Sequence, residues 1–228
     1  MALAGRGAVA IWHDISPDGR DAFYAWHGSE HMPERVGIPG FRRGRRYVSV
    51  AGTPEFFNLY ETESTATVSG AAYLERLNHP TPWTRATVPH FRGVARSLCA
   101  VAATFGHGQG GLVGTFRYAV GPGNAATHRE RLATAVLPVL AQRPGMAGCH
   151  LLVADEAASA VKTAEKNVRA EDNLIPPWIV LVEGWGDLPA FDALCRSLLA
   201  DGTFAAALAP PALSIYRLQC TIDPGDLA

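Results

Sequence analysis

The chain lacks several local signatures that mark common enzyme classes. The glycine-rich segment Gly106–Gly111 does not end in the G-K-[ST] of a phosphate-binding loop. Gly121-Pro122-Gly123 lacks the third glycine of a dinucleotide fingerprint, and no G-x-S-x-G nucleophile elbow is present. The sequence therefore argues against nucleotide-dependent and serine-hydrolase chemistry.

Cysteines are few, and neither sign of charge dominates. The four cysteines form no C-x-x-C pair, which argues against a zinc knuckle or a redox motif. The net charge is −1, with Lys+Arg 20 against Asp+Glu 21, so we expect no nucleic-acid partner. There is no signal-peptide h-region and no apolar run long enough to span a bilayer, so we expect a cytoplasmic protein without a membrane partner.

The 228 residues contain a weak internal repeat. Pro39-Gly40-Phe41 recurs as Pro144-Gly145-Met146, and Phe57–Glu61 recurs as Ile179–Glu183. The spacing grows between these two matches, which indicates an insertion over residues 154–172 in the second half. We expect this insertion to be a tolerated surface loop or short helix, with a lid over a site as the alternative.

Each half is predicted to form the order β-α-β-β-α-β, the ferredoxin-like unit. In the first half the predicted elements are strand 9–15, helix 16–31, strands 45–50 and 56–61, helix 68–77 and strand 98–105. In the second they are strand 112–120, helix 125–142, strands 149–154 and 179–183, helix 189–199 and strand 214–222. The fold class is thus α+β, with two tandem ferredoxin-like repeats, 1–106 and 107–228, forming an intrachain α+β barrel.

The densest group of titratable residues is Trp26–Arg35, which contains two His, two Glu and one Arg. We expect the helix to end near His31, because Pro33 disfavours helical backbone at the residue before it. The basic cluster that follows, Arg42, Arg43, Arg45 and Arg46, is expected to be an exposed strand start, with binding of an anionic substrate as the alternative.

These residues carry a family resemblance. Trp26-His27, Glu30–Arg35, Ile38–Phe41 and Arg45-Arg46-Tyr47 resemble the EthD-like proteins of the dimeric α+β barrel superfamily. The resemblance implies a small-molecule enzyme, allows a homodimer, and places His31 near a cleft between the first helix and the sheet. Members of that superfamily include cofactor-free monooxygenases, isomerases, cyclases, dehydratases and haem-handling enzymes.

The repeat indicates which residues face inward. The stripe Leu132, Val136, Val139 and Leu140 of the second helix corresponds to His27, His31, Glu34 and Arg35. Asn58 and Tyr60 likewise replace Val180 and Val182. Polar groups are costly to bury without partners, so this exchange predicts a ligand-filled cavity in the first half and a packed core in the second.

We expect acid–base catalysis without a cofactor on a small, partly aromatic carbonyl or phenolic compound, of isomerase, lyase or cyclase type. The expected catalytic residues are His31 and His27, with Glu34 raising the pKa of a paired histidine and Tyr60 donating to a developing oxyanion. The expected substrate contacts are Trp12, Phe23, Trp26, Glu30, Asn58, Tyr73 and Trp83.

Three alternatives remain open. His27-Gly28-Ser29-Glu30-His31 matches H-x-x-E-H, so a metal- or haem-dependent enzyme could use the two histidines. We rank this below a metal-free site, because Pro33 cuts the helix short. The others are a cofactor-free monooxygenase and a non-catalytic binding protein.

Overall fold

The protein is an α+β structure built around a closed antiparallel barrel of eight strands. The computed structural model describes residues 2–169 and 172–227. Around the barrel the order is β1-β3-β2-β8-β5-β7-β6-β4, and β4 returns to pair with β1. The strands are β1 (Gly7–Ile15), β2 (Phe41–Ala51), β3 (Phe56–Thr62), β4 (Phe91–Gly106), β5 (Leu112–Tyr118), β6 (Met146–Ala154), β7 (Trp178–Gly184) and β8 (Ala212–Ile222).

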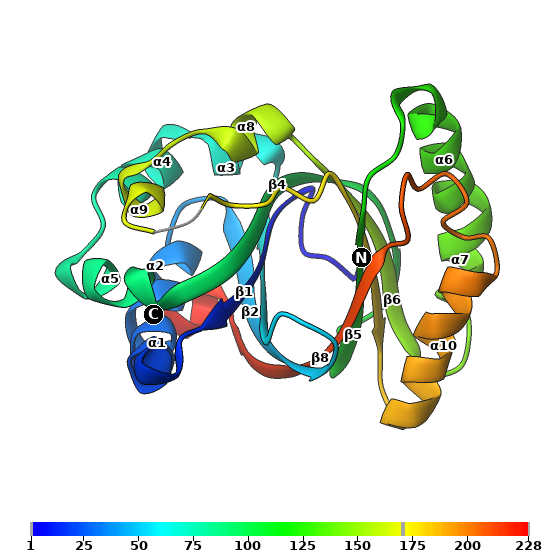
Figure 1. The fold of residues 1–228 in the computed structure, drawn as a ribbon, viewed down its shortest axis with the longest axis horizontal. Coiled ribbons are helices and arrows are strands. Elements are labelled where there is room, and N and C mark those ends of the chain that lie inside the picture. The colour runs from blue at the N-terminus through cyan, green and yellow to red at the C-terminus, as the bar shows by residue number, and fades with distance from the viewer. Residues whose placement is uncertain (1, 170–171, 228) are drawn as a thin grey trace.

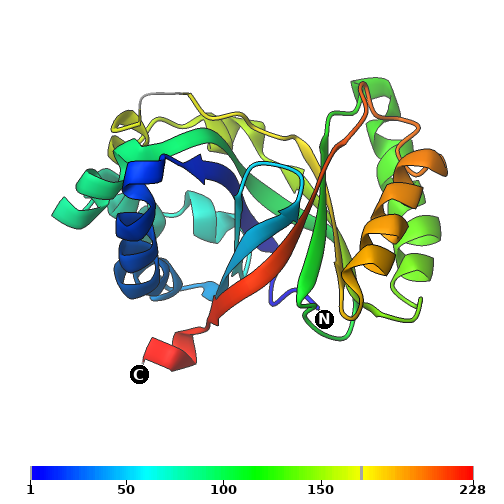
Figure 2. The ribbon, with the colours of Figure 1, turned by 60° about the horizontal axis from the view of Figure 1, so that its bottom comes forward.

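The helices cover two opposite sides of this barrel (Figure 1). One group is α1 (Arg20–Trp26), α2 (Met32–Val36), α3 (Thr65–Ser69), α4 (Ala71–Asn78) and α5 (Pro82–Thr87). The other is α6 (Ala125–Arg131), α7 (Leu137–Leu140) and α10 (Leu188–Ala200). The view in Figure 2 shows the same division, with a short 3-10 turn, Pro224–Leu227, projecting at the C-terminal end. No helix in the described part of the chain is long and apolar enough to cross a membrane.

The strand order is the same in the two halves of the chain. The first four strands lie side by side as β4-β1-β3-β2, and the last four lie as β8-β5-β7-β6. The pairs β2–β8 and β4–β6 join the two sets and close the barrel. Every predicted strand is present, although most extend beyond the predicted bounds. The predicted helix 68–77 is instead the two short helices α3 and α4, because Gly70 between them is extended.

Alternate residues of β3 face the barrel interior and the helices. Phe57 and Leu59 belong to the apolar cluster inside the barrel, whereas Tyr60 packs with the helical layer outside it. On the other side of the barrel, Val180 and Val182 pack with Leu132 and Leu140 in one apolar cluster, so that region is a filled core.

A buried ionic cluster crosses the barrel interior and corrects one sequence prediction. Arg45, expected to be exposed, is 0% exposed and forms ion pairs with Glu61 of β3 and Glu183 of β7. Arg43 is also buried and binds Glu61 through two nitrogens. The error arose because β2 begins at Phe41, so that its alternation turns these positions inward. Arg42 does lie on the surface, as expected.

The helix after β1 does not stop before Pro33. A π-helical turn over His27–His31 leads directly into α2, which runs to Val36 and contains Pro33. The wider turn accommodates the proline ring, and the missing N–H costs one helical hydrogen bond. A second π turn, Leu132–Val136, precedes Pro138 in the same way. A π turn also shifts the inward stripe by one residue, so Arg35 is buried whereas Glu34 is 14% exposed.

The ionic cluster generates a stability prediction. Arg45→Met leaves Glu61 and Glu183 buried without their shared cation, so the free energy of unfolding should fall by about 3–5 kcal/mol. Urea unfolding followed by circular dichroism measures this change.

The matched control is Arg42→Met, which removes the exposed ion pair with Glu63 on the same strand. It should cost about 1 kcal/mol or less. Equal losses in the two variants would show that the buried cluster contributes nothing beyond a surface pair.

Candidate functional site

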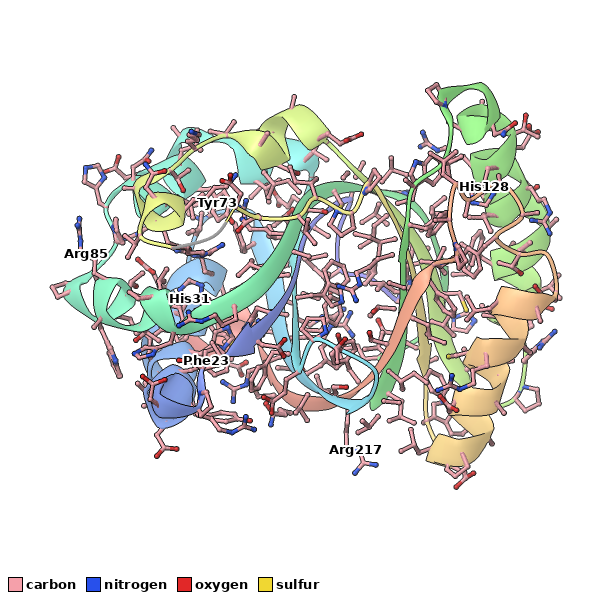
Figure 3. All side chains as sticks on the ribbon, in the orientation of Figure 1. Phe23, His31, Tyr73, Arg85, His128 and Arg217 are labelled. Atoms are coloured by element: carbon pink, nitrogen blue, oxygen red, sulfur yellow. The ribbon has the colours of Figure 1, made fainter. Side chains whose placement is uncertain are left out.

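The candidate site is a small cavity between the first helices and the outer face of the β1–β3 sheet. Its volume is about 30 Å³, which is enough for about one water molecule and too small for an aromatic ring. In Figure 3 His31 and Tyr73 lie on this side of the barrel, and His128 lies on the opposite side. The lining residues are Ile11, Trp26, His27, His31, Arg35, Phe41, Asn58, Tyr60, Tyr73, Val88, Phe91, Arg96, Glu165 and Arg169.

His27 is held at both ring nitrogens. An arginine N–H can only donate, so Nδ1 of His27 accepts from Arg46 Nη1 at 3.3 Å. The neutral ring then carries its proton on Nε2, which lies 3.4 Å from Tyr60 Oη. Burial, followed by the charge of Arg46, lowers the pKa of His27 well below its usual value. With its oxygen facing that N–H, the Tyr60 hydroxyl can turn its own hydrogen to a ligand.

His31 has no hydrogen-bond partner at either ring nitrogen among the residues the structure describes, and its Nδ1 is fully buried. The ring packs against Trp26, at 4.2 Å between centroids, and lies 5.5 Å from the ring of His27. Burial, then the neighbouring Arg35, lowers the pKa of His31 well below its usual value. His31 is therefore a neutral imidazole with an unpartnered lone pair at the cavity.

Asn58 presents an acceptor rather than a donor. Nδ1 of His13 lies 3.3 Å from the Asp14 carbonyl, so Nε2 is left to accept from Asn58 Nδ2 at 2.9 Å. Burial lowers the pKa of His13 to about 3, which keeps that ring neutral. The other amide atom, Asn58 Oδ1, is buried without a partner and can accept from a ligand hydroxyl.

A strap from the second half of the chain closes the cavity. It includes α8 (Glu156–Ala160) and α9 (Ala164–Asn167), which lie over α3, α4 and β4 (Figure 1). This segment is the predicted insertion, of which residues 170 and 171 lie outside the described residues. Glu165 pairs with Arg35, and Arg169 lines the cavity beside it. The strap thus contains short helices, as expected, and it covers a cavity built by the other half.

The structure brings together six of the eleven residues predicted for the site. Those at the cavity are His27, His31, Asn58, Tyr60, Trp26 and Tyr73. Phe23 packs just behind them, against His27 and His13. Trp12 points into the barrel instead, where it stacks on Phe57 and donates to Thr115 Oγ1 at 3.2 Å. Trp83 is 40% exposed and does not line the cavity.

The predicted histidine–glutamate pairs are wrong. Glu30 accepts hydrogen bonds from Thr81 and Thr84, which tie the π turn to α5. Glu34 lies 3.4 Å from Arg35 and 3.9 Å from Arg76. Neither carboxylate lies beside a histidine ring, and burial, followed by the neighbouring arginine charges, lowers the pKa values of both histidines.

Three charged residues that line the cavity, Arg96, Glu165 and Arg169, were not predicted to belong to a site. Arg35 lies on the predicted inward stripe, and Arg46, which contacts His27, had been grouped with the exposed charges. Glu165 and Arg169 stand one helical turn apart in an insertion whose position in space no local pattern reveals. For Arg96 the sequence offers no signal beyond a polar residue on a buried strand.

The site does not fit the metal or haem alternative. Both nitrogens of His27 are engaged by Arg46 and Tyr60, so it offers no free lone pair to a metal. The described residues contain no cluster of three His, Cys, Asp or Glu side chains suited to a metal ion.

No protein-family model matches the sequence, and no curated protein matches it. Solved structures show the same fold. An anthrone oxidase-like protein has a TM-score of 0.67 at 13% identity, covering 100% of this chain and 98% of its own. A proposed monooxygenase from Fusobacterium nucleatum has a TM-score of 0.59 at 7% identity, covering 97% and 96%. A proposed monooxygenase from Lactobacillus acidophilus has a TM-score of 0.55 at 10% identity, covering 96% of this chain and 97% of its own. These structures share the α+β barrel fold of this chain, while the EthD-like assignment is not confirmed.

The buried histidines predict a pH dependence of stability. Because the folded pKa values of His13, His27 and His31 lie below the ordinary value of about 6.5, the unfolded chain binds more protons as the pH falls. The stability they contribute is thus present above about pH 6.5 and lost below it. Each should remove about 1 kcal/mol between about pH 7 and about pH 5.5. Urea unfolding at both pH values measures the loss.

His31→Gln should reduce the pH-dependent loss of unfolding free energy by about 1 kcal/mol, the contribution of one histidine. His79→Gln, which removes a histidine that is 72% exposed, should leave it as in the wild type. A loss that is identical in His31→Gln and in the wild type would contradict the burial of a neutral His31.

Proposed function

We propose that the N-terminal cavity is the active site of an enzyme that removes a proton from a small, partly aromatic phenolic or carbonyl compound without a cofactor. The observation that carries the proposal is the neutral, buried His31, whose lone pair lacks a partner and stands at a cavity lined by cationic groups. A neutral imidazole is a base, and adjacent guanidinium groups stabilise the anion that its action produces.

Each polar group at the cavity has a part in this step. His31 takes a proton from an acidic C–H, and the electron pair of that bond passes to the carbonyl oxygen of the substrate. The Tyr60 hydroxyl donates to this developing enolate or phenolate oxygen, while His27 holds the tyrosine oxygen from behind. Asn58 Oδ1 accepts from a substrate hydroxyl. Trp26 and Phe91 supply flat apolar walls.

The anion has two possible fates. Reprotonation at another atom, or loss of a leaving group, gives the isomerase, lyase or cyclase outcome. Reaction with molecular oxygen converts an acidic CH₂ into a carbonyl, with one oxygen atom entering the product and the other leaving as water. The likeness in fold to an anthrone oxidase-like protein and to proposed monooxygenases favours the oxygenase outcome.

We also propose that the chain consists of two ferredoxin-like repeats, 1–106 with the site and 107–228 with a structural role, related to EthD-like proteins. The equal strand order of the two halves supports this organisation. The two π turns support it too, because they begin at His27 and Leu132, the same spacing that aligns Pro39-Gly40 with Pro144-Gly145.

Proton abstraction can be tested without knowing the natural reaction. Anthrone and related phenolic C–H acids are incubated with the enzyme anaerobically in D₂O, and exchange of the acidic hydrogen is followed by NMR. His31→Ala should slow the enzyme-dependent exchange by about 10²-fold or more, and Tyr60→Phe by a smaller factor. Oxygen uptake under air then separates oxygenase from isomerase.

The matched control is His128→Gln. His128 is buried and lies 3.0 Å from a tyrosine hydroxyl, as His27 does at a longer distance, but it belongs to the opposite side of the barrel (Figure 3). This variant should exchange at the wild-type rate. Wild-type exchange in a folded His31→Ala protein would refute the assignment of the base.

A further inference from the structure

The cavity holds more positive charge than the described residues balance. Three guanidinium groups line it, those of Arg35, Arg96 and Arg169, against the single lining carboxylate of Glu165. The arginine side chains are all buried, with Arg35 3%, Arg96 8% and Arg169 9% exposed. Buried charges are costly unless each meets a counter-charge or a full set of hydrogen bonds.

The hydrogen bonds of these arginines are incomplete. Arg35 Nη1 and Arg169 Nε are buried and have no hydrogen-bond partner. Arg96 donates to Tyr73 Oη at 2.8 Å, which is a neutral acceptor. Glu165 pairs with Arg35 through one oxygen and lies 3.5 Å from Arg169 through the other. Glu34 also lies 3.4 Å from Arg35 Nη1, so two carboxylates serve three guanidinium groups, and donors remain for a third.

The carboxylate that is present comes from the strap, whose two ends and middle are held differently. At its ends, backbone hydrogen bonds join the strap to β4, from Asp155 N to Leu98 O and from Leu174 N to Val94 O. Its middle is held by the Glu165–Arg35 pair, by the bond from Ala164 N to Asn78 Oδ1 and by packing of Val168 against an apolar cluster. Since the cavity has no room for an aromatic ring, part of its wall must move to admit one.

We propose that Arg35, Arg96 and Arg169 form a subsite for a carboxylate group of the substrate, and that Glu165 occupies part of this subsite in the closed, ligand-free protein. Arginine forks bind carboxylates in a bidentate manner, and Glu165 already shows that a carboxylate is accepted there. The substrate class is then an aromatic hydroxy acid or keto acid. Its carboxylate meets the arginines, its hydroxyl meets Asn58 Oδ1, and its reacting carbon faces His31.

This inference rests on the proposed function for the identity of the site, but its test measures binding alone. Salicylate and its uncharged analogue salicylamide are titrated into the protein by calorimetry. Salicylate should bind at least about tenfold more tightly than salicylamide. The ring signals of His31 in NMR spectra should shift on binding, which locates the ligand in this cavity.

Variants identify the groups responsible. Glu165→Gln removes the internal competitor, so it should tighten salicylate binding about tenfold more than it tightens salicylamide binding. Arg169→Gln should weaken salicylate binding about tenfold and spare salicylamide. The control Arg85→Gln, which alters an exposed arginine on α5, should bind both compounds as the wild type does (Figure 3).

Equal affinity for the two compounds, or a Glu165→Gln variant with unchanged or weaker salicylate binding, would overturn the subsite. Thermal unfolding of each variant verifies that it is folded, and Glu165→Ala repeats the measurement with a second side chain. If salicylate binding fails these tests but hydrogen exchange still depends on His31, the subsite is rejected and the proposed function stands. Carboxylate-selective binding in a protein that exchanges equally well without His31 would retain the subsite and reject the catalysis.

Discussion

The barrel depends on one buried arginine. Arg45 projects from β2 into the interior and forms ion pairs with Glu61 on the adjacent β3 and with Glu183 on β7, in the other half of the chain. His150 on β6 faces Glu183 at 3.3 Å. Burial alone would raise the pKa of Glu183, but Arg45 and His150 outweigh it and hold that pKa below its usual range. Buried ion pairs add little net stability compared with apolar packing, yet they penalise any arrangement that separates them. The cluster therefore selects the closure in which the two sets of strands face each other.

The balance of positive and negative charges at the outer cavity differs from that inside the barrel. Inside the barrel every carboxylate meets an arginine, whereas at the cavity arginines outnumber the described carboxylates and the histidines are neutral. The neutrality follows from burial and from the arginines themselves, since a positive neighbour disfavours a second positive charge. A site of this kind is suited to hold an anion and to accept a proton, and it discourages the binding of cations.

Periodicity and punctuation in the sequence were sufficient to predict the element order and the presence of a polar cavity under the first helix. Alternation on β3 placed Asn58 and Tyr60 on the helix side, and the helical stripe placed His27 and His31 there. The π turn could not be predicted, because it changes the helical period by a fraction of a residue, and it leaves Glu34 partly exposed although the stripe had placed it inward with Arg35. Arg45 was misjudged because a charged run suggests a surface unless its distant partner Glu183 is known. The strap was recognised as an insertion, but its docking on the other half depends on long-range contacts.

Closure within a single chain has a consequence for symmetry. A barrel assembled from two identical subunits must carry the same side chains on both sides, so any polar group that helps one site is also buried at the other. Here the two sides are encoded separately, and one contains His27, Asn58 and Tyr60 where the other contains Leu132, Val180 and Val182. The apolar side has a filled core, whereas the polar side contains a cavity. The strap extends from the second half over this cavity, and the first half has no equivalent insertion in its described residues. Because the two sides differ in sequence, a polar cavity on one side need not interrupt the apolar packing on the other.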